Sequence, residues 1–220
     1  VAKLCRRATV ASLCRAASAD IERAWEALRH AERPRIHTFI ATSPLHMRVK
    51  LNKSPDEVLD AIARSVSLAR SLCEDVEWSA EDATRSEPNF LARAVEIAIA
   101  SGATTINLPD TVGYATPETY GAMFRDVINR AGGAERAIFS THCHNDLGLA
   151  VANSLAAVVA GARQVESTIN GIGERAGNAA LEEVAMAIRV RSDVVPVRHN
   201  IVSTEITRAS RLVSGITGFQ

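Results

Sequence analysis

Residues 137–146, Ala137-Ile138-Phe139-Ser140-Thr141-His142-Cys143-His144-Asn145-Asp146, form an apolar run that becomes polar at its carboxyl end. In an extended strand successive side chains point to opposite faces, so His142 and His144 are expected to point the same way. Two imidazoles held side by side supply half of a divalent metal site. The H-x-H spacing alone is a weak signal, however, and two polar residues closing a strand are the alternative. The rest of the chain decides between these readings.

The composition predicts one globular domain. The 220 residues are 47% hydrophobic and 23% charged, which is enough to bury a substantial core in a soluble protein. The formal net charge is zero, so bulk electrostatics predict neither a nucleic acid nor a membrane as partner. Because the cysteines are scattered and no apolar stretch has membrane-spanning length, we expect a reduced, intracellular protein.

The chain repeats one unit, in which a short β-branched or apolar run precedes a longer helical pattern. Helix-start signals with proline at the first helical position support three of the helices. The predicted strands are Thr9–Cys14, Ile36–Ala41, Val76–Ser79, Thr104–Leu108, Ala137–Thr141 and Gln164–Ile169. The predicted helices are 20–31, 54–72 (opened by Ser54-Pro55-Asp56-Glu57), the helix after Ser86-Glu87-Pro88, the helix after Thr116-Pro117-Glu118, 147–160 and 179–190.

Strict alternation of strands and helices predicts an α/β protein with an all-parallel sheet. An open doubly wound sheet and a TIM (β/α)8 barrel both fit this order. Polar residues at the carboxyl end of nearly every strand favour the barrel, because its active site is assembled from those ends. The predicted strand ends supply Arg15, His37 with Thr42 and Ser43, Ser79 with Glu81 and Asp82, Asp110 with Thr111, His142 with His144, and Asn170.

Six strands cannot close an eight-stranded barrel. The chain also begins at Val1 in the middle of a pattern, so we expect an N-terminal part that carries two further strands to be missing.

Several segments carry a family resemblance, in order and with compatible spacing over essentially the whole chain. The segments are Ile36 to Ser43, Glu81-Asp82-Ala83, Asn107 to Tyr114, His142 to Asp146, Asn170 to Asn178 and Ser210 to Gly215. They resemble the 2-isopropylmalate synthase family, which implies a partial metal-dependent TIM-barrel catalytic domain with strands three to eight present and strands one and two missing. On this basis we expect residues 1–195 to form the partial barrel and 196–220 to begin a linker or helical subdomain.

The resemblance implies an acyltransferase that joins acetyl-CoA and 2-oxoisovalerate to give 2-isopropylmalate, a Claisen-type condensation and the first committed step of leucine biosynthesis. It places His142, His144 and Asn178 among the metal ligands, with a fourth ligand, an aspartate, in the missing first strand. A 2-oxo acid chelates a divalent ion, which polarises the ketone towards attack. The mixed nitrogen and oxygen set suits Mg²⁺, Mn²⁺ or Zn²⁺. Cys143 has the opposite strand parity, so we interpret it as a packing residue.

The resemblance also assigns roles to four other residues. Glu81 matches a catalytic glutamate that orients water or relays a proton; a structural pairing with an arginine such as Arg85 is the alternative. Residues His37, Ser79 and Thr111 match substrate-binding positions, and ordinary strand-end capping is their alternative.

The family's proposed general base, a histidine, and its tyrosine partner lie in a C-terminal subdomain that is contributed across a homodimer. We therefore assign neither role to His46 or His199. The glycines at 171, 173 and 177 do not have dinucleotide-binding spacing, and we expect them to let the loop turn so that Asn178, at a helix N-terminus, aims its amide at the metal.

Two other functions remain open. A sibling enzyme, citramalate or homocitrate synthase, would share the metal ligands and differ in the pocket. A non-catalytic fragment or interaction protein would retain the sequence pattern of the barrel without its activity. We expect little condensation activity from the 220 residues alone. The implied compartment is the bacterial cytoplasm or the plant plastid.

Overall fold

The computed structural model describes residues 1–219 and contains the six predicted strands. Four of them end one or two residues beyond the predicted ends, and β2 ends as predicted but begins two residues earlier. By contrast, β6 ends before the predicted Ile169, where a 3-10 turn begins with Asn170 in the left-handed region. The strands are β1 (Val10–Arg15), β2 (Pro34–Ala41), β3 (Val76–Glu81), β4 (Thr105–Asp110), β5 (Ile138–Cys143) and β6 (Gln164–Glu166).

The helices between the strands follow the predicted order. Those that begin with proline start as predicted, whereas α1, α6 and α7 each differ from prediction by about two to three residues at one end or both. A short helix α2, a π-helical turn η1 and the helix α8 were not predicted. The main helices are α1 (Ser18–Leu28), α2 (Pro44–His46), α3 (Pro55–Leu72), α4 (Pro88–Ala100), α5 (Pro117–Arg130), α6 (Ala150–Val159), α7 (Leu181–Val190) and α8 (Ile206–Thr217). The shorter turns are η1 (Met47–Leu51), η2 (Ala83–Arg85), η3 (Ala134–Arg136), η4 (Ile169–Gly171) and η5 (Ser203–Glu205).

Side-chain caps explain why α3 and α4 begin where they do. Ser54 accepts from the backbone amide of Glu57, and the Glu57 carboxylate accepts from the backbone amide of Ser54, so two otherwise unpaired amides are satisfied. At α4 the cap is Glu87 rather than the serine before it, because the Glu87 carboxylate accepts from the amides of Asn89 and Phe90. Both starts therefore rest on local side chains visible in the sequence.

The strands are hydrogen-bonded in chain order, β1-β2-β3-β4-β5-β6. The pairs from β1 to β4 are parallel, with His37 opposite Glu77 and Ser79 opposite Asn107. A doubly wound sheet reverses its strand order at a switch point, and the described strands have no such reversal. The order is that of a singly wound barrel, which confirms the prediction of an incomplete α/β barrel with parallel strands.

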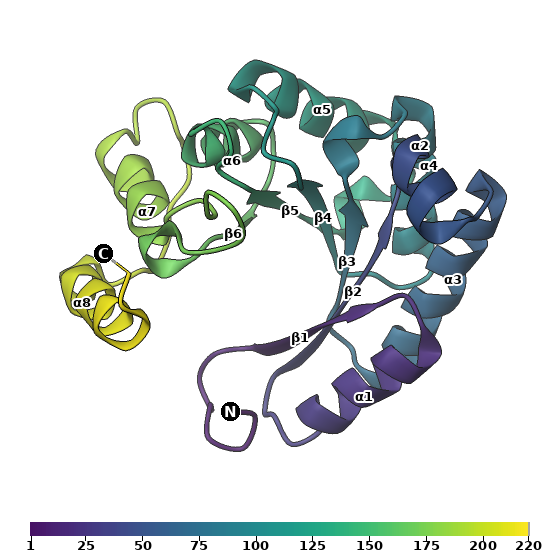
Figure 1. Cartoon of the computed structure of the whole chain (residues 1–220), viewed down its shortest axis with the longest axis horizontal. Helices are drawn as coiled ribbons and strands as arrows, with labels where there is room; N and C mark the ends of the chain where they lie inside the picture. Colours follow the sequence, from purple (N-terminus) through teal and green to yellow (C-terminus); the bar gives the residue numbers. More distant parts are fainter. Residues whose placement is uncertain (220) are drawn as a thin grey trace. The chain divides into compact units, whose positions relative to one another are not determined.

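The chain forms two compact units, and the first comprises residues 1–109 and 126–140. Helices α1, α3 and α4 pack on one face of its strands (Figure 1). The even-numbered residues Ile36, Trp78 and Ile106 are fully buried and apolar, whereas the odd-numbered residues His37, Glu77, Ser79 and Asn107 on the same strands are polar. The strand alternation thus separates an apolar layer under the helices from a polar face.

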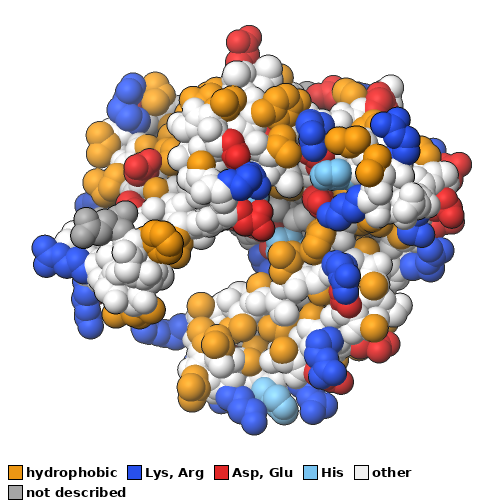
Figure 2. Space-filling view, in the orientation of Figure 1, with side chains coloured by type: hydrophobic (Ala, Val, Ile, Leu, Met, Phe, Trp, Pro, Cys, Tyr) orange, Lys and Arg blue, Asp and Glu red, His pale blue; other side chains and the backbone are white. Residues whose placement is uncertain are grey.

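The edge strand β1 of this unit carries exposed apolar side chains. Leu13 is 63% exposed and Leu4, in the segment before the strand, is 87% exposed. Figure 2 shows hydrophobic side chains gathered along this edge. An unpaired strand edge with apolar neighbours favours association with another strand.

The second unit comprises residues 110–125 and 141–219 of the described chain. In it α6 packs against β6 and α7, and α8 packs against η4 and η5. Tyr120 is buried and its hydroxyl lies 2.9 Å from Thr141 Oγ1. Burial raises the pKa of the Tyr120 hydroxyl well above its ordinary value and also raises the pKa of the Cys143 thiol. Cys143 is therefore a neutral, fully buried packing residue, as its strand parity predicts.

The helix α8 lies in the segment 196–220 that the sequence assigns to a linker or helical subdomain, and the boundary at residue 195 stays a prediction. None of the helices in residues 1–219 combines the length and apolar character needed to cross a membrane.

Replacing the cap of α3 tests the local origin of this helix. We expect Ser54→Ala to lower the free energy of unfolding by about 1 kcal/mol, because the backbone amide of Glu57 loses the Ser54 hydroxyl as its acceptor. Urea unfolding followed by circular dichroism measures the change. Ser71→Ala, near the exposed end of the same helix, is the control and should cost clearly less; equal losses for the two variants would contradict the capping account.

Candidate metal centre and active site

The structure brings His142 and His144 together at the end of β5. The strand ends at Cys143, and His144 follows in an isolated backbone bridge to Asn178. The two Nε2 atoms lie 3.3 Å apart, with the rings nearly perpendicular at 82°. The predicted side-by-side placement is therefore present in the second unit, and both Nε2 atoms are directed at the same small region.

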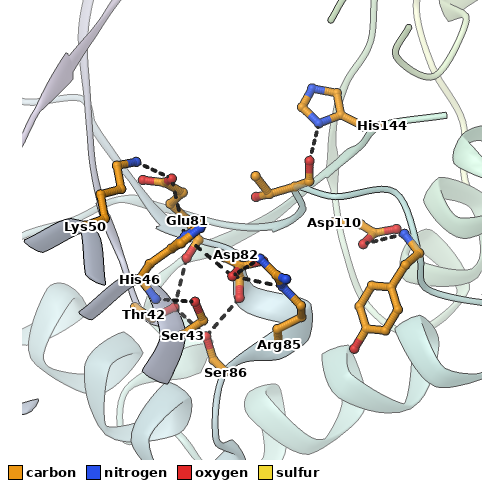
Figure 3. Close-up of polar contacts among 12 residues, drawn as sticks. Thr42, Ser43, His46, Lys50, Glu81, Asp82, Arg85, Ser86, Asp110 and His144 are labelled. Carbon is orange, nitrogen blue, oxygen red and sulfur yellow. Dashed lines mark hydrogen bonds and ion pairs between the residues drawn. The ribbon is translucent and has the colours of Figure 1, made fainter. Parts of the chain in front are cut away.

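Each histidine uses its other ring nitrogen on the protein. His142 Nδ1 lies 2.9 Å from Glu166 Oε2. His144, labelled in Figure 3, has its Nδ1 2.6 Å from the backbone carbonyl of Thr111. A carbonyl oxygen only accepts hydrogen bonds, so His144 Nδ1 carries the proton and the lone pair of neutral His144 is on Nε2. Partners of this kind fix the tautomer and the ring orientation of metal-binding histidines. The arrangement presents two Nε2 atoms as ligands.

Asn178, the backbone-bridge partner of His144, carries an unpaired side-chain oxygen. Its Nδ2 donates to the carbonyl of Ile172 at 3.1 Å, while its Oδ1 is buried and has no hydrogen-bond partner among the described residues. Buried polar atoms without partners are uncommon and call for an explanation such as an ion. Asn178 lies two residues before Ala180, the N-cap of α7, so the loop rather than the helix end positions it.

Glycines make this loop possible. A side chain at residue 173 would collide with the Asn178 amide, and one at residue 177 would collide with the carbonyl of Gly171. Gly177 also has a φ of +95°, which favours glycine. The loop therefore folds tightly around Asn178, whose backbone bridges to His144.

These three residues, His142, His144 and Asn178, fit a divalent ion. Two neutral imidazole nitrogens and an amide oxygen form a mixed donor set that suits Mg²⁺, Mn²⁺ or Zn²⁺ without a thiolate. The unpartnered Asn178 oxygen is the observation that favours an ion over a purely structural hydrogen-bond cluster. We call this set the histidine–asparagine centre.

An ion pair braces the loop beside the centre. The Arg175 guanidinium contacts both carboxylate oxygens of Asp146, at 2.7 and 2.8 Å. Arg175 Nη2 also donates, at 2.9 Å, to the Thr111 carbonyl that binds His144. The hydrogen bond from Arg175, together with its charge, holds the pKa of Asp146 below its ordinary value against the opposing effect of desolvation.

His37 and Ser79 meet on the polar face of the first unit. His37 Nε2 lies 2.6 Å from Ser79 Oγ, and Asn107 Nδ2 donates to the same Oγ at 2.9 Å. All three side chains are almost fully buried. The structure thus brings together two predicted substrate-binding residues and adds Asn107.

Glu81, the last residue of β3, is paired with Lys50. The Lys50 ammonium lies 2.5 Å from Glu81 Oε1, and His46 Nδ1 lies 3.7 Å from the same oxygen (Figure 3). The alternative pairing of Glu81 with Arg85 is wrong, because Arg85 binds the buried Asp82 at 2.8 Å. The backbone of Asp82 is in the left-handed region directly after the strand, and in this turn Arg85, three residues later, contacts the Asp82 carboxylate.

Thr111 contributes through its backbone. Its carbonyl holds His144 and Arg175 in the second unit, whereas a role for its hydroxyl towards a substrate stays a prediction.

Sequence reasoning missed Glu166 and Lys50. Glu166 lies on a predicted strand and has the same side-chain parity as the polar Gln164, opposite to that of Val165. This parity was a signal available in the sequence. Lys50 had no such signal, because the π-helical turn that carries it could not be told from a solvated loop.

Comparison with protein families gives one match that covers nearly the whole chain. The family model described as HMGL-like matches residues 1–213.

Curated relatives match over the full length of this chain. The chain is 65% identical over 219 residues to a 2-isopropylmalate synthase of Caulobacter vibrioides strain NA1000 / CB15N, covering all of this chain and 42% of the relative. It is 63% identical over 222 residues to a protein of the same name from Methylobacterium nodulans, covering 43% of that relative. The chain therefore spans less than half the length of the curated relatives it matches.

Solved structures share the fold at low identity. Hydroxymethylglutaryl-CoA lyase from Pseudomonas aeruginosa superposes with a TM-score of 0.76 at 20% identity, covering 96% of this chain and 70% of that one. The carboxyl transferase domain of Rhizobium etli pyruvate carboxylase gives a TM-score of 0.65 at 18% identity, covering 94% of this chain and 34% of that one.

Removing the Glu166 carboxylate tests its role as the partner of His142 in the candidate metal centre. We expect Glu166→Ala to weaken Mn²⁺ binding roughly tenfold to a hundredfold, because His142 loses the group that orients its ring, and Glu166→Gln to weaken it less. Isothermal titration calorimetry measures the Kd. Glu174→Gln, at a 77% exposed side chain in the same unit, is the control. Unchanged Mn²⁺ binding in Glu166→Ala would contradict this role.

The Asp146–Arg175 ion pair predicts an acid-dependent loss of stability. The folded-state pKa of Asp146 is depressed. The contribution of its carboxylate to the free energy of unfolding is therefore present above the unfolded pKa of about 4 and is lost as the pH falls through the folded pKa. We expect Asp146→Asn to be less stable than the unsubstituted chain at neutral pH and the difference to shrink below about pH 4. Thermal unfolding across pH measures it, with Asp60→Asn on the exposed side of α3 as control. A pH-independent difference would count against the ion pair.

Proposed function

Because the chain belongs to the HMGL-like family, we propose that it is the metal-binding catalytic barrel segment of a 2-isopropylmalate synthase, which condenses acetyl-CoA with 2-oxoisovalerate. The single observation that carries the proposal is 65% identity, over the whole chain, with relatives of that name. Since the chain spans about 42% of their length, the activity is proposed for the intact protein.

We propose that the histidine–asparagine centre holds the divalent ion. His142 and His144 would bind it through Nε2 and Asn178 through Oδ1. When bound, the ion supplies Lewis-acid polarisation of a 2-oxo acid's ketone. Glu166 and the Thr111 carbonyl keep the two imidazoles in the required tautomers.

His37 and Ser79 are proposed to bind oxygens of the 2-oxo acid. Asn107 donates to Ser79 Oγ, which leaves the Ser79 hydroxyl proton for another acceptor, either His37 Nε2 or an anionic substrate oxygen. Hydrogen-bond donors that are already oriented before the substrate arrives stabilise charge at low reorganisation cost. The Thr111 hydroxyl is proposed as a further donor on the grounds of the family resemblance.

Glu81 is proposed to handle a proton or a water molecule. In the reaction a base removes a proton from the acetyl methyl group, and the resulting carbanion bonds to the ketone carbon as the π electrons of the ketone move to its oxygen, which then takes up a proton. Water later cleaves the thioester, which leaves a carboxylate and releases coenzyme A. Lys50 engages Glu81 Oε1, which leaves Oε2 of the carboxylate to accept a proton or to orient a water. The general base itself is expected outside this chain.

The expected homodimer and the expected compartment, bacterial cytoplasm or plastid, remain predictions.

Acceptor specificity tests the proposal directly. We expect the intact protein to release coenzyme A fastest with 2-oxoisovalerate, more slowly with pyruvate or 2-oxoglutarate, and to lose the activity after chelation of divalent ions. Release can be followed with a thiol reagent. A clear preference for pyruvate would favour citramalate synthase instead, and one for 2-oxoglutarate would favour homocitrate synthase.

The role of Glu81 can be examined in the same assay. We expect Glu81→Gln to lower kcat by about 10² or more, in the range of lost acid–base catalysis. Glu74→Gln, an exposed carboxylate just before β3, is the control. A kcat for Glu81→Gln equal to the control would remove Glu81 from the mechanism while leaving the overall activity in place.

A further inference from the structure

Asn170 occupies a junction that none of the assigned roles explains. It lies in η4 with a φ of +61°, a conformation that asparagine tolerates better than most residues. Its backbone amide is bound by both carboxylate oxygens of Glu182, at 3.0 and 3.1 Å, from the first turn of α7. The main chain at Asn170 is therefore held by one helix.

The Asn170 side chain reaches a second helix. Its Nδ2 donates to the backbone carbonyl of Ser210 and to the hydroxyl of Ser214, both at 3.2 Å. These acceptors are one turn apart on α8, and α8 packs on η4 at this point. Because the amide engages both acceptors at once, it fixes the position of α8 along its own axis as well as its distance from the loop.

The next residue leads to the metal-binding loop. The carbonyl of Gly171 accepts from the backbone amide of Asn178 at 2.9 Å. The carbonyl of Ile172 accepts from the Asn178 side-chain amide at 3.1 Å. A displacement of Asn170 therefore moves both groups that orient Asn178, since residues 170–172 are consecutive.

We infer that Asn170 is a positioning residue that couples the placement of α8 to the orientation of Asn178 in the histidine–asparagine centre. The inference rests on the proposed metal site and deepens it. Asn170 contacts no metal ligand with its side chain; it acts through the peptide that follows it. Whatever shifts α8, whether a neighbouring segment or a bound partner, then changes the affinity of the centre for its ion.

The test compares Mn²⁺ affinities of the intact protein by isothermal titration calorimetry. We expect Asn170→Gly, which keeps the left-handed backbone and removes both bonds to α8, to weaken Mn²⁺ binding about tenfold. Ser214→Ala removes one bond from the helix side and should weaken binding by a smaller factor. The double variant should bind like Asn170→Gly, because the bond to Ser214 is already lost there.

Ser210→Ala is the matched control, since it changes a serine one turn away and keeps the carbonyl that Asn170 uses. Melting temperatures of the metal-free variants separate positioning from support of the fold. A lower melting temperature with an unchanged Kd in both Asn170→Gly and Ser214→Ala would overturn the inference. Asn178→Ala tests the metal site itself: if Mn²⁺ affinity survives that change, the proposed centre fails, whatever the Asn170 variants do.

Discussion

The alternation of side chains along parallel strands is the constraint on which the rest of the structure depends. In the first unit it sends Ile36, Trp78 and Ile106 under the helices and leaves His37 and Ser79 on the opposite face. A buried polar face is tolerable only when its groups bond to one another. The sheet therefore creates a set of connected polar side chains as a direct result of burying its apolar layer.

The same rule made part of the fold and site predictable from the sequence. The placement of His142 and His144 follows from a separation of two in an extended strand, and the start of α3 follows from the residues that cap it. These features depend on residues close in sequence. The sequential strand order was predictable as well, because regular alternation of strands and helices admits few topologies.

Other features depended on contacts between distant segments and could not be predicted. Glu81 was assigned a local arginine as its alternative partner, yet the cation beside it is Lys50, carried by a π-helical turn. The histidine partners were missed for the same reason: Glu166 and the Thr111 carbonyl are 24 and 33 residues away from the imidazoles that they orient. Which groups meet across such separations is set by register and loop path, not by local pattern.

The contacts of the Thr111 carbonyl affect which amino-acid substitutions the protein tolerates near the centre. It is a main-chain acceptor, and it holds His144 and Arg175 whatever side chain stands at residue 111. Substitution at this position can alter the hydroxyl without removing the acceptor. The nearby turn is less tolerant, since Gly113 has a φ of +62° and a side chain there would collide with Asp146. Substitutions are therefore expected to be tolerated better at residue 111, whose carbonyl contacts His144 and Arg175, than at residue 113, which has no side chain.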